Sequence, residues 1–281
     1  MAASARFLEG FTPAAYAAPT AVHHLHMAFA VEKTWEPVGV CVRQEGDDIV
    51  GDIYGEADTA SVRAQVERIL SLDVDGSGFL DVGRRDPAVA RLQAHYPGLR
   101  PVLFWSPYEA AAWSIISLRT PMSVAARAKQ HIAQELGDAV DFHSERLYAL
   151  PPPRRIMELE SFPGLSTRKV EYLSSVAQAA LEGKLDAHRL RSILQSKAIR
   201  ELQEIHGIGP FSAELILVRG AGDPDFFPTQ ERRIHQAMAQ TYGLGNQPKQ
   251  EQLLKIAEAW RPYRAWASFL FRRQFEEERR P

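Results

Sequence analysis

The pattern of hydrophobic and polar residues changes once along the chain. Between about residues 22 and 56, the segments VHHLHMAFAV, PVGVCVRQE and DDIVGDIYGE have the texture of strands, and Glu-Pro and Gly-Asp turns separate them. A helix is predicted over 59–71, with Thr59 or Ser61 near its N-cap. Beyond residue 106, nearly every segment is typical of a helix. These predicted helices span 106–118, 122–136, 144–149, 153–160, 166–182, 186–195, 197–205, 210–219, 230–242, 249–260 and 262–277.

This change of pattern divides the chain into parts. We predict a flexible N-terminus over 1–20, a small antiparallel α/β domain over 21–99 and an all-helical domain over 100–281. The expected fold class is therefore α+β, mainly helical. A chain of 281 residues, of which 45% are hydrophobic, can bury a full core in two or three domains.

The segment from residue 202 to 238 carries the most functional information. Apolar residues follow a helical spacing on both sides of Gly207 and Gly209, which predicts two helices joined by a hairpin whose bends admit only glycine. Pro210 suits the first turn of the second helix, where a missing N–H costs nothing. A helix N-terminus that follows glycines presents free N–H groups and the positive end of the helix dipole, which together can hold a phosphate. The hairpin therefore predicts a clamp for the DNA backbone.

The residues that follow the hairpin give a longer ordered pattern. Arg219 and Gly220 come next, then GDPDFFP ending at Pro228, and then an acidic residue, Glu231. This order resembles the helix-hairpin-helix (HhH-GPD) DNA glycosylase superfamily, and within it the 3-methyladenine DNA glycosylase II branch of alkylation-repair enzymes. Supporting segments are RPVLFWSPYEAAAW at 100–113, FPGLSTRKVEYLSSVAQAALEGKLD at 162–186 and AEAWRPYRAWASFLFRR at 257–273, so the resemblance spans about residues 70 to 273.

The resemblance implies an active-site cleft between two helical subdomains and a specific reaction. The expected function is a monofunctional DNA N-glycosylase that flips alkylated bases such as 3-methyladenine out of the duplex and hydrolyses the N-glycosidic bond, which starts base-excision repair. The catalytic Asp of the family falls on Glu231 here. A carboxylate beside the sugar stabilises the positive charge that develops when the bond breaks. The alternative for Glu231 is an exposed acid in the first turn of a helix, where the helix dipole favours it.

Two aromatic residues occupy further positions of interest. Phe211 stands where bifunctional relatives carry a nucleophilic lysine, so no Schiff-base route and no lyase activity are expected. The resemblance places Phe211 in the base pocket, and packing in the core is the alternative. Tyr263 has the same two interpretations.

The remaining implied contacts concern DNA. Gly207, Gly209 and Ser212 match residues that contact a phosphate. The backbone carbonyls of Gln203, Ile205 and Ile208 match a site for a monovalent cation, Na⁺ or K⁺, and no other cofactor is expected. The segment ISLRTPMS at 116–123 replaces a Gly-Gln loop whose side chain fills the gap left by the flipped base. Leu118, Arg119, Thr120 and Pro121 are the candidates for that wedge and for DNA contact, because apolar or arginine wedges are physically reasonable.

Composition and charge limit the other possibilities. The net charge is only -2, so DNA binding must depend on a local patch. The single cysteine, Cys41, excludes a disulfide or a four-cysteine cluster within the chain, and we expect it to be a buried apolar residue of a strand. His23, His24 and His26 lack a carboxylate at a matching spacing, so we interpret them as surface and edge residues rather than metal ligands. No membrane span or secretory signal is expected.

These observations predict a cytoplasmic monomer, associated with the nucleoid in a bacterium, that binds double-stranded DNA containing damaged bases. Two alternatives remain at this point. One is a non-catalytic DNA or lesion-binding protein on the same scaffold, which has lost its chemistry through the Asp-to-Glu change and the altered wedge loop. The other is a glycosylase for a different lesion, deaminated or oxidised.

Overall fold

A computed structural model describes residues 24–142 and 145–279, so the predicted N-terminus over 1–20 and His23 lie outside the described residues. The strands β1 (His24–Ala30), β2 (Pro37–Glu45) and β3 (Asp48–Tyr54) form an antiparallel sheet in that order, as the alternating pattern predicts. The helix α2 (Thr59–Ile69) follows. Its N-cap is Asp58 rather than Thr59 or Ser61, because the Asp58 carboxylate accepts a hydrogen bond of 2.8 Å from the N–H of Ser61.

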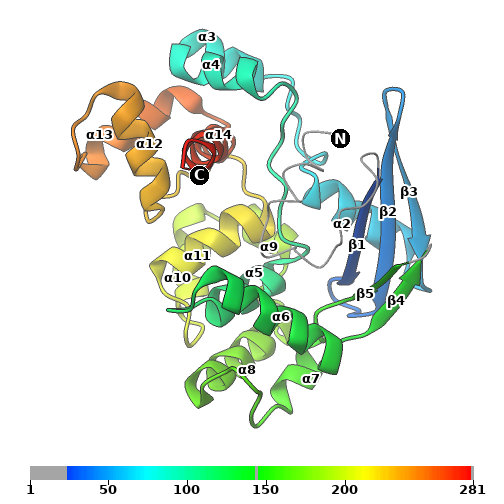
Figure 1. Cartoon of the computed structure of the whole chain (residues 1–281). Coiled ribbons are helices and arrows are strands. Elements are labelled where there is room, and N and C mark those ends of the chain that lie inside the picture. Colours follow the sequence, from blue (N-terminus) through cyan, green and yellow to red (C-terminus); the bar gives the residue numbers. More distant parts are fainter. Residues whose placement is uncertain (1–23, 143–144, 280–281) are drawn as a thin grey trace.

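The two faces of this sheet pack against different parts of the chain. On one face, Leu25, Met27 and Phe29 join the main core together with residues of α2. On the other face, Ala28 packs with Val140 and Leu147. Those two residues belong to a second antiparallel pair, β4 (Ala139–Phe142) and β5 (Glu145–Tyr148), which lies beside the sheet in Figure 1.

The helix predicted over 144–149 is therefore wrong. The segment Glu145–Tyr148 is a strand whose one buried residue, Leu147, faces the sheet while Arg146 is exposed. Over only four residues, a helical pattern of apolar positions cannot be distinguished from the alternating pattern of a strand. Pairing with β4 decides the outcome, and pairing is a long-range effect.

Two helices that the sequence pattern did not predict come between the sheet and the helical part in chain order. They are α3 (Phe79–Arg85) and α4 (Pro87–His95), and they contact the C-terminal helices, as Figure 1 shows. Asp86 fixes them there, because its Oδ2 accepts hydrogen bonds from the Tyr242 hydroxyl at 2.6 Å and from Trp260 Nε1 at 2.7 Å. The domain boundary at residue 99 stays a prediction.

The rest of the described chain is helical apart from its loops. Its helices are α5 (Pro107–Ile116), α6 (Met122–Leu136), α7 (Pro153–Met157), α8 (Thr167–Leu181), α9 (Ala187–Ser192), α10 (Gln195–Gln203), α11 (Pro210–Leu215), the π-helix η2 (Ile216–Ala221), α12 (Arg232–Tyr242), α13 (Gln250–Ala257), the 3₁₀ helix η3 (Glu258–Trp260) and α14 (Arg264–Glu277). The expected fold class, α+β and mainly helical, is confirmed. None of the described helices is long and apolar enough to cross a membrane.

The helix α5 is the centre of the helical part, since all ten of its residues are buried. The π-helix η2 packs on it at Gly220, where a Cβ atom would come within 2.8 Å of the Pro107 Cα atom. The single helix predicted over 210–219 is thus two helices of different pitch. Gly222 ends η2 with a φ of +82°, and this turn begins the loop that leads to Glu231.

Candidate active site and DNA-binding hairpin

The hairpin between α10 and α11 contains two glycines with different surroundings. Gly207 has a φ of +95°, and a Cβ atom there would lie 2.5 Å from the ring of Tyr172 on α8. Gly209 has a φ of −93°, which other residues also adopt, and a Cβ atom there would meet nothing within 4 Å. The expectation that only glycine fits at both bends is therefore wrong for Gly209, which faces open space.

The open side of Gly209 coincides with the start of α11. Gly209 is the N-cap and makes no side-chain cap, Pro210 occupies the first turn, and Ser212 is half-buried in that turn. The first backbone N–H groups of a helix have no partner within the helix. The open space beside Gly209 therefore leaves room for a phosphate at the start of α11.

The carbonyl groups of the predicted cation site lie in the same hairpin. Gln203 is the last residue of α10, and the carbonyl of Ile205 accepts a hydrogen bond of 2.9 Å from the N–H of Ile208. A carbonyl oxygen has a second lone pair that can bind a cation. The cation site at Gln203, Ile205 and Ile208 stays a prediction.

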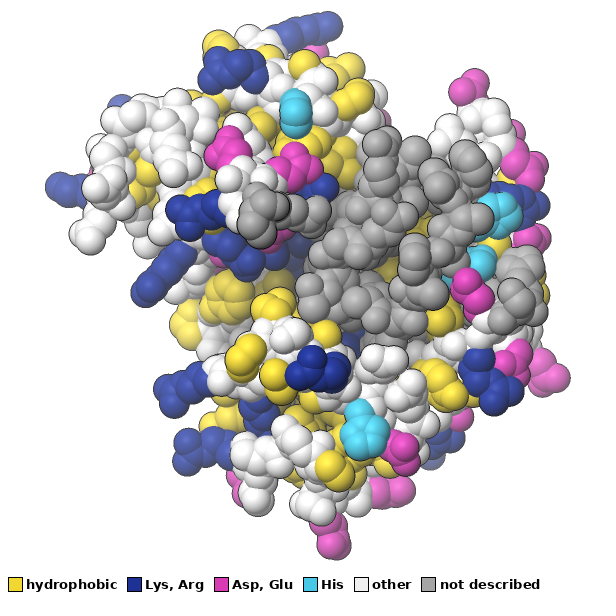
Figure 2. All heavy atoms as spheres, viewed as in Figure 1, with side chains coloured by type: hydrophobic (Ala, Val, Ile, Leu, Met, Phe, Trp, Pro, Cys, Tyr) yellow, Lys and Arg dark blue, Asp and Glu magenta, His cyan; other side chains and the backbone are white. Residues whose placement is uncertain are grey.

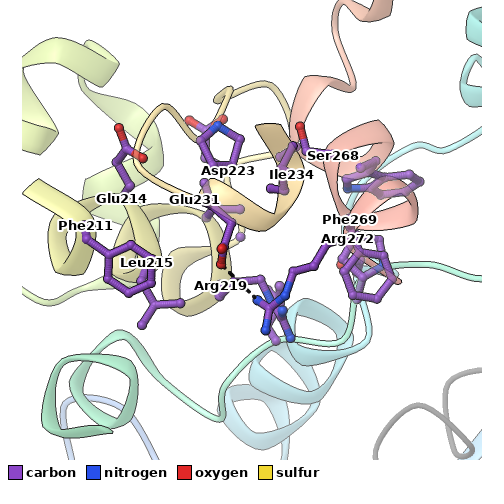
Figure 3. A pocket seen from close by; sticks show the side chains of 18 residues that line it. Phe211, Glu214, Leu215, Arg219, Asp223, Glu231, Ile234, Ser268, Phe269 and Arg272 are labelled. Carbon is purple, nitrogen blue, oxygen red and sulfur yellow. Dashed lines mark hydrogen bonds and ion pairs between the residues drawn. The ribbon is translucent and has the colours of Figure 1, made fainter. Parts of the chain in front are cut away.

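A mainly apolar pocket opens beside the hairpin, and Figure 3 shows its side chains. It is lined by residues of α11, η2, the following loop, α12 and α14, including Leu215, Val218, Pro228, Ile234, Trp266 and Phe269. Phe211 also lines it, and 44% of this residue is exposed. Of the two interpretations of Phe211, pocket lining agrees with the structure and core packing does not.

Glu231 projects into this pocket as the N-cap residue of α12, and only 8% of it is exposed. Its Oε1 accepts hydrogen bonds from the backbone N–H of Arg233 at 3.2 Å and from Arg233 Nε at 3.0 Å, and its Oε2 accepts one from Arg233 Nη2 at 2.9 Å. From α14, Arg272 Nη1 lies 3.8 Å from Oε2 (Figure 3). The burial of Glu231 and its place at the pocket do not fit the alternative of an exposed surface acid.

The electrostatic surroundings keep Glu231 ionised. Burial by itself raises the pKa of this carboxyl group, but the hydrogen bonds from Arg233 and the charge of Arg272 outweigh that effect, and the net pKa is lowered. Glu231 therefore stays ionised on acidification below the usual range of a glutamate, as a carboxylate that is paired with Arg233.

A second carboxylate at the pocket, Glu214 of α11, is not among the candidate residues that the sequence indicated. Its Oε2 accepts a hydrogen bond of 2.8 Å from the N–H of Gln230, and its Oε1 accepts one from the Thr229 hydroxyl. Burial raises the pKa of Glu214 above the ordinary value. These bonds hold the residues just before Glu231, so Glu214 positions the Glu231 carboxylate. The only available signal was its place three residues after Phe211 on α11, which puts the two residues on the same face of the helix.

Two arginine side chains, Arg219 and Arg272, also line the pocket. Arg219 of η2 is buried, its Nη2 donates a 2.7 Å hydrogen bond to the Val102 carbonyl, and its guanidinium lies 5.4 Å from the centre of the Phe269 ring. Burial, with the nearby charge of Arg272, lowers the pKa of Arg219 to about 9. Arg272 is held by Glu276, with 3.0 Å between Nε and Oε1. The pocket thus places Glu231 between cations on α12 and α14.

The predicted wedge lies in the turn after α5. Leu118 and Arg119 are exposed, and Arg119 has a left-handed backbone with a φ of +51°. Lys169 of α8 holds this turn, because its Nζ donates hydrogen bonds to the Ile116 carbonyl at 2.6 Å and to Thr120 Oγ1 at 2.7 Å. The Thr120 hydroxyl is thus engaged in a hydrogen bond within the protein, while the side chains of Leu118 and Arg119 are exposed on the surface of the turn. No pattern in the sequence indicated Lys169.

Tyr263 is not among the residues that line this pocket. It is buried, its ring packs against Phe79 and Trp266, and its hydroxyl donates a 2.7 Å hydrogen bond to the Asp75 carbonyl. It therefore links α14 to the segment before α3. The core interpretation of Tyr263 agrees with the structure, and the pocket interpretation does not.

Comparison with known proteins decides the family. The model of the HhH-GPD superfamily of base excision DNA repair proteins matches residues 112–262. The chain belongs to this superfamily. The match includes the hairpin, the loop and Glu231, so the resemblance drawn from the sequence is confirmed.

The matches to individual relatives have low sequence identity but cover most of the chain. The chain is similar to a DNA-3-methyladenine glycosylase of Bacillus subtilis (strain 168), with 23% identity over 202 residues that cover 70% of this chain and 67% of the relative. Among solved structures, it is similar to a 3-methyladenine DNA glycosylase from Archaeoglobus fulgidus, with a TM-score of 0.74 and 22% identity over 90% of this chain and 87% of that one. An 8-oxoguanine glycosylase/lyase of Clostridium acetobutylicum, solved with double-stranded DNA, matches with a TM-score of 0.67 and 18% identity over 88% and 87%.

Proposed function

We propose that this protein is a DNA N-glycosylase that flips alkylated bases of the 3-methyladenine type out of the duplex and hydrolyses their N-glycosidic bond. The observation that carries this proposal is the buried, ionised Glu231 carboxylate in an apolar pocket that opens beside Phe211 and the hairpin. The substrate class is supported by the relatives of B. subtilis and A. fulgidus, whose names specify 3-methyladenine.

The chemistry follows from the position of Glu231. Breaking the N-glycosidic bond develops positive charge on the sugar, and a fixed carboxylate next to the sugar stabilises that charge and orients a water molecule. A nucleotide alkylated at a purine ring nitrogen already carries a positive charge, so its base leaves without a strong general acid. Glu231 adds one methylene to the Asp of the family, and its place at the N-cap sets the depth from which it reaches the sugar.

The protein acts in this proposal as a hydrolase of the glycosylase II type without lyase activity. A lyase needs an amine that forms a Schiff base with the sugar. Among the described residues that line the pocket there is no lysine, and the family position of that amine is Phe211. The C. acetobutylicum neighbour named as a glycosylase/lyase is similar at 18% identity, and that similarity bears on the fold alone.

DNA binding is assigned to the hairpin and to the turn after α5. The N–H groups at the start of α11, with Ser212, bind a phosphate, and the carbonyls of Gln203, Ile205 and Ile208 bind a Na⁺ or K⁺ ion that bridges to it. Leu118 or Arg119 fills the gap left by the flipped base. Figure 2 shows Lys and Arg side chains mainly along the helical side of one face, while Asp and Glu are more numerous along the sheet. The protein binds as a monomer in this proposal, since one pocket and one hairpin suffice.

One observation favours the alternative of a non-catalytic lesion-binding protein. Arg233 binds both oxygens of Glu231, so the negative charge that would face the sugar is largely compensated. A reader of lesions needs the pocket and the hairpin but no free carboxylate. The two functions differ in whether a base is released.

A base-release assay on alkylated genomic DNA tests the proposal, with undamaged DNA as the control. We expect free 3-methyladenine to appear in proportion to protein, and we expect the resulting abasic strands to break only after alkali treatment. Strand breaks that form without alkali would contradict the monofunctional assignment. Preferential binding to alkylated duplex without any released base would replace the enzyme by the lesion-binding protein.

A further inference from the structure

Three potential metal ligands converge on the sheet, far from the pocket. In the antiparallel register of β1 and β2, His26 lies directly opposite Cys41, and His24 lies two residues away on the same face. One ligand atom from each of the three residues lies within 4.8 Å of the others. The closest pair is His24 Nδ1 and Cys41 Sγ, which are 3.3 Å apart.

A carboxylate from another part of the chain orients one of these histidines. Glu145 of β5 places Oε2 2.7 Å from His26 Nδ1, and the side chains of His26 and Glu145 are only 8% and 28% exposed. A carboxylate that holds one ring nitrogen of a histidine is the usual outer partner of a histidine that binds a metal through its other nitrogen.

We propose that His24, His26 and Cys41 bind a Zn²⁺ ion, with Glu145 as the carboxylate that orients His26. One thiolate and two imidazoles form a ligand set that zinc prefers, and three protein ligands leave a fourth position for water. Zn–N bonds of about 2.0–2.1 Å and Zn–S bonds of about 2.3 Å in a tetrahedral site place the ligand atoms roughly 3.3–3.6 Å apart. The His24–Cys41 distance of 3.3 Å already has that value, and small rotations of the histidine rings close the rest.

The burial of Cys41 distinguishes a metal-binding cysteine from a reactive one. Cys41 has no exposed surface, so a substrate cannot reach its sulfur, whereas His24 is partly exposed and gives an ion access from the edge of the cluster. The family match covers residues 112–262, which include Glu145 but none of the three ligands. The ion binds within the N-terminal sheet, and the His26–Glu145 bond connects its site to the β4–β5 pair of the matched region, which lies next to the sheet in Figure 1.

Cobalt provides a direct probe, because the chain has a single cysteine. The full chain, without a polyhistidine tag, is titrated with Co²⁺ and then with Zn²⁺. We expect one equivalent of Co²⁺ to give thiolate-to-cobalt charge-transfer absorption, which only Cys41 can produce, and one equivalent of Zn²⁺ to abolish it. Absence of that absorption in the folded protein would overturn the proposal.

Variants and a second measurement complete the test. Cys41→Ser should lose the charge-transfer absorption, and Glu145→Gln should weaken Zn²⁺ binding by about 10- to 100-fold, as loss of an outer partner typically does. His95→Gln is the matched control, because the His95 side chain is 68% exposed and stands outside the cluster. X-ray absorption at the zinc edge of the unmodified protein should show one sulfur ligand at about 2.3 Å, independently of whether any variant folds. A coordination shell of nitrogen and oxygen alone, or Zn²⁺ binding unchanged in Cys41→Ser, would overturn the proposal.

Discussion

The hairpin region and the sheet bring polar groups together by different routes. Gly207, Phe211 and Glu231 lie within 25 consecutive residues, and the helices around them set their relative positions. The cluster on the sheet combines β1, β2 and β5, so its members His26 and Glu145 are 119 positions apart. A site of the first kind leaves a continuous pattern in the sequence, and a site of the second kind depends on strand register.

The two regions also differ in what compensates their charges. In the pocket, permanent cations on α12 and α14 surround a carboxylate, so its negative charge is fixed over the usual pH range. On the sheet, the potential ligands are histidine and cysteine, which carry no permanent positive charge and offer nitrogen and sulfur atoms to a metal ion. The pocket is therefore set for electrostatic stabilisation and the sheet face for coordination.

The largest expected effect comes from removing the charge of Glu231. Glu231→Gln should reduce base release from alkylated DNA by about a hundredfold or more, because loss of a well-placed electrostatic group costs about that much in rate. Affinity for undamaged duplex should not change. Single-turnover base release and DNA binding, measured on the same preparations, provide the check.

Two companion variants define the requirement more closely. Glu231→Asp keeps the charge and restores the residue type of the family, so it should retain activity. Glu258→Gln is the control, because the Glu258 side chain is 56% exposed and lies outside the pocket. Equal base release by the wild type and Glu231→Gln would remove the catalytic assignment and transfer the role to another acid.

The second expected effect separates the two glycines of the hairpin. Gly209→Val should leave the fold intact, since a side chain there meets open space, and should weaken binding to damaged and undamaged duplexes alike by about 10- to 100-fold. Gly207→Ala should instead destabilise the protein by about 1–3 kcal/mol, because the φ of +95° and the Tyr172 ring leave no room for a Cβ atom. Thermal unfolding and DNA titration of both variants distinguish these outcomes. A Gly209→Val protein that is stable and binds DNA normally would show that the hairpin is not the phosphate clamp.

The third expected effect concerns pH and Arg233. In the wild type the pKa of Glu231 is lowered, so base release should persist as the pH falls below the ordinary value for glutamate. Arg233→Gln removes the main partner of the carboxylate and leaves burial as the dominant effect. The pKa of Glu231 should then rise, and activity should begin to fall at a higher pH. Coincident pH profiles of base release for the two proteins would contradict the electrostatic role of Arg233.

Much of the sheet and of the helical part follows from the sequence, because in these segments the local hydrophobic pattern and the tertiary packing favour the same element. The helix α6 has the predicted bounds, Met122–Leu136, and β2 has the predicted bounds, Pro37–Glu45. Both segments show a strong pattern over many residues. Glu231 and Phe211 were found through a continuous motif, and the structure places both at one pocket.

The remainder depends on contacts between distant segments. The expectation for Cys41 specified a buried residue of a strand, which is correct, but not its partner across the sheet. His24 and His26 were interpreted as surface and edge residues because no carboxylate stands at a matching spacing in the sequence. The carboxylate partner of His26, Glu145, lies in a segment that was predicted to be a helix. Glu214 and Lys169 were missed because each acts by holding a loop that begins far from it in the chain.

The smallest expected effect tests whether such a distant contact matters for the wedge. Lys169→Met keeps the length of the side chain but removes the hydrogen bonds to the Ile116 carbonyl and to Thr120 Oγ1. These bonds shape the turn and touch neither the base nor the sugar, so only a small part of their free energy bears on base flipping, and we expect a loss of a few fold in single-turnover base release. Binding to an abasic duplex, which needs no base flipping, should be unchanged. Arg168→Met is the matched control, because it removes a neighbouring exposed charge without touching these bonds. If the two variants lose activity equally, the contribution of Lys169 is general attraction to DNA; if Lys169→Met alone loses it, the turn after α5 depends on α8 for its shape.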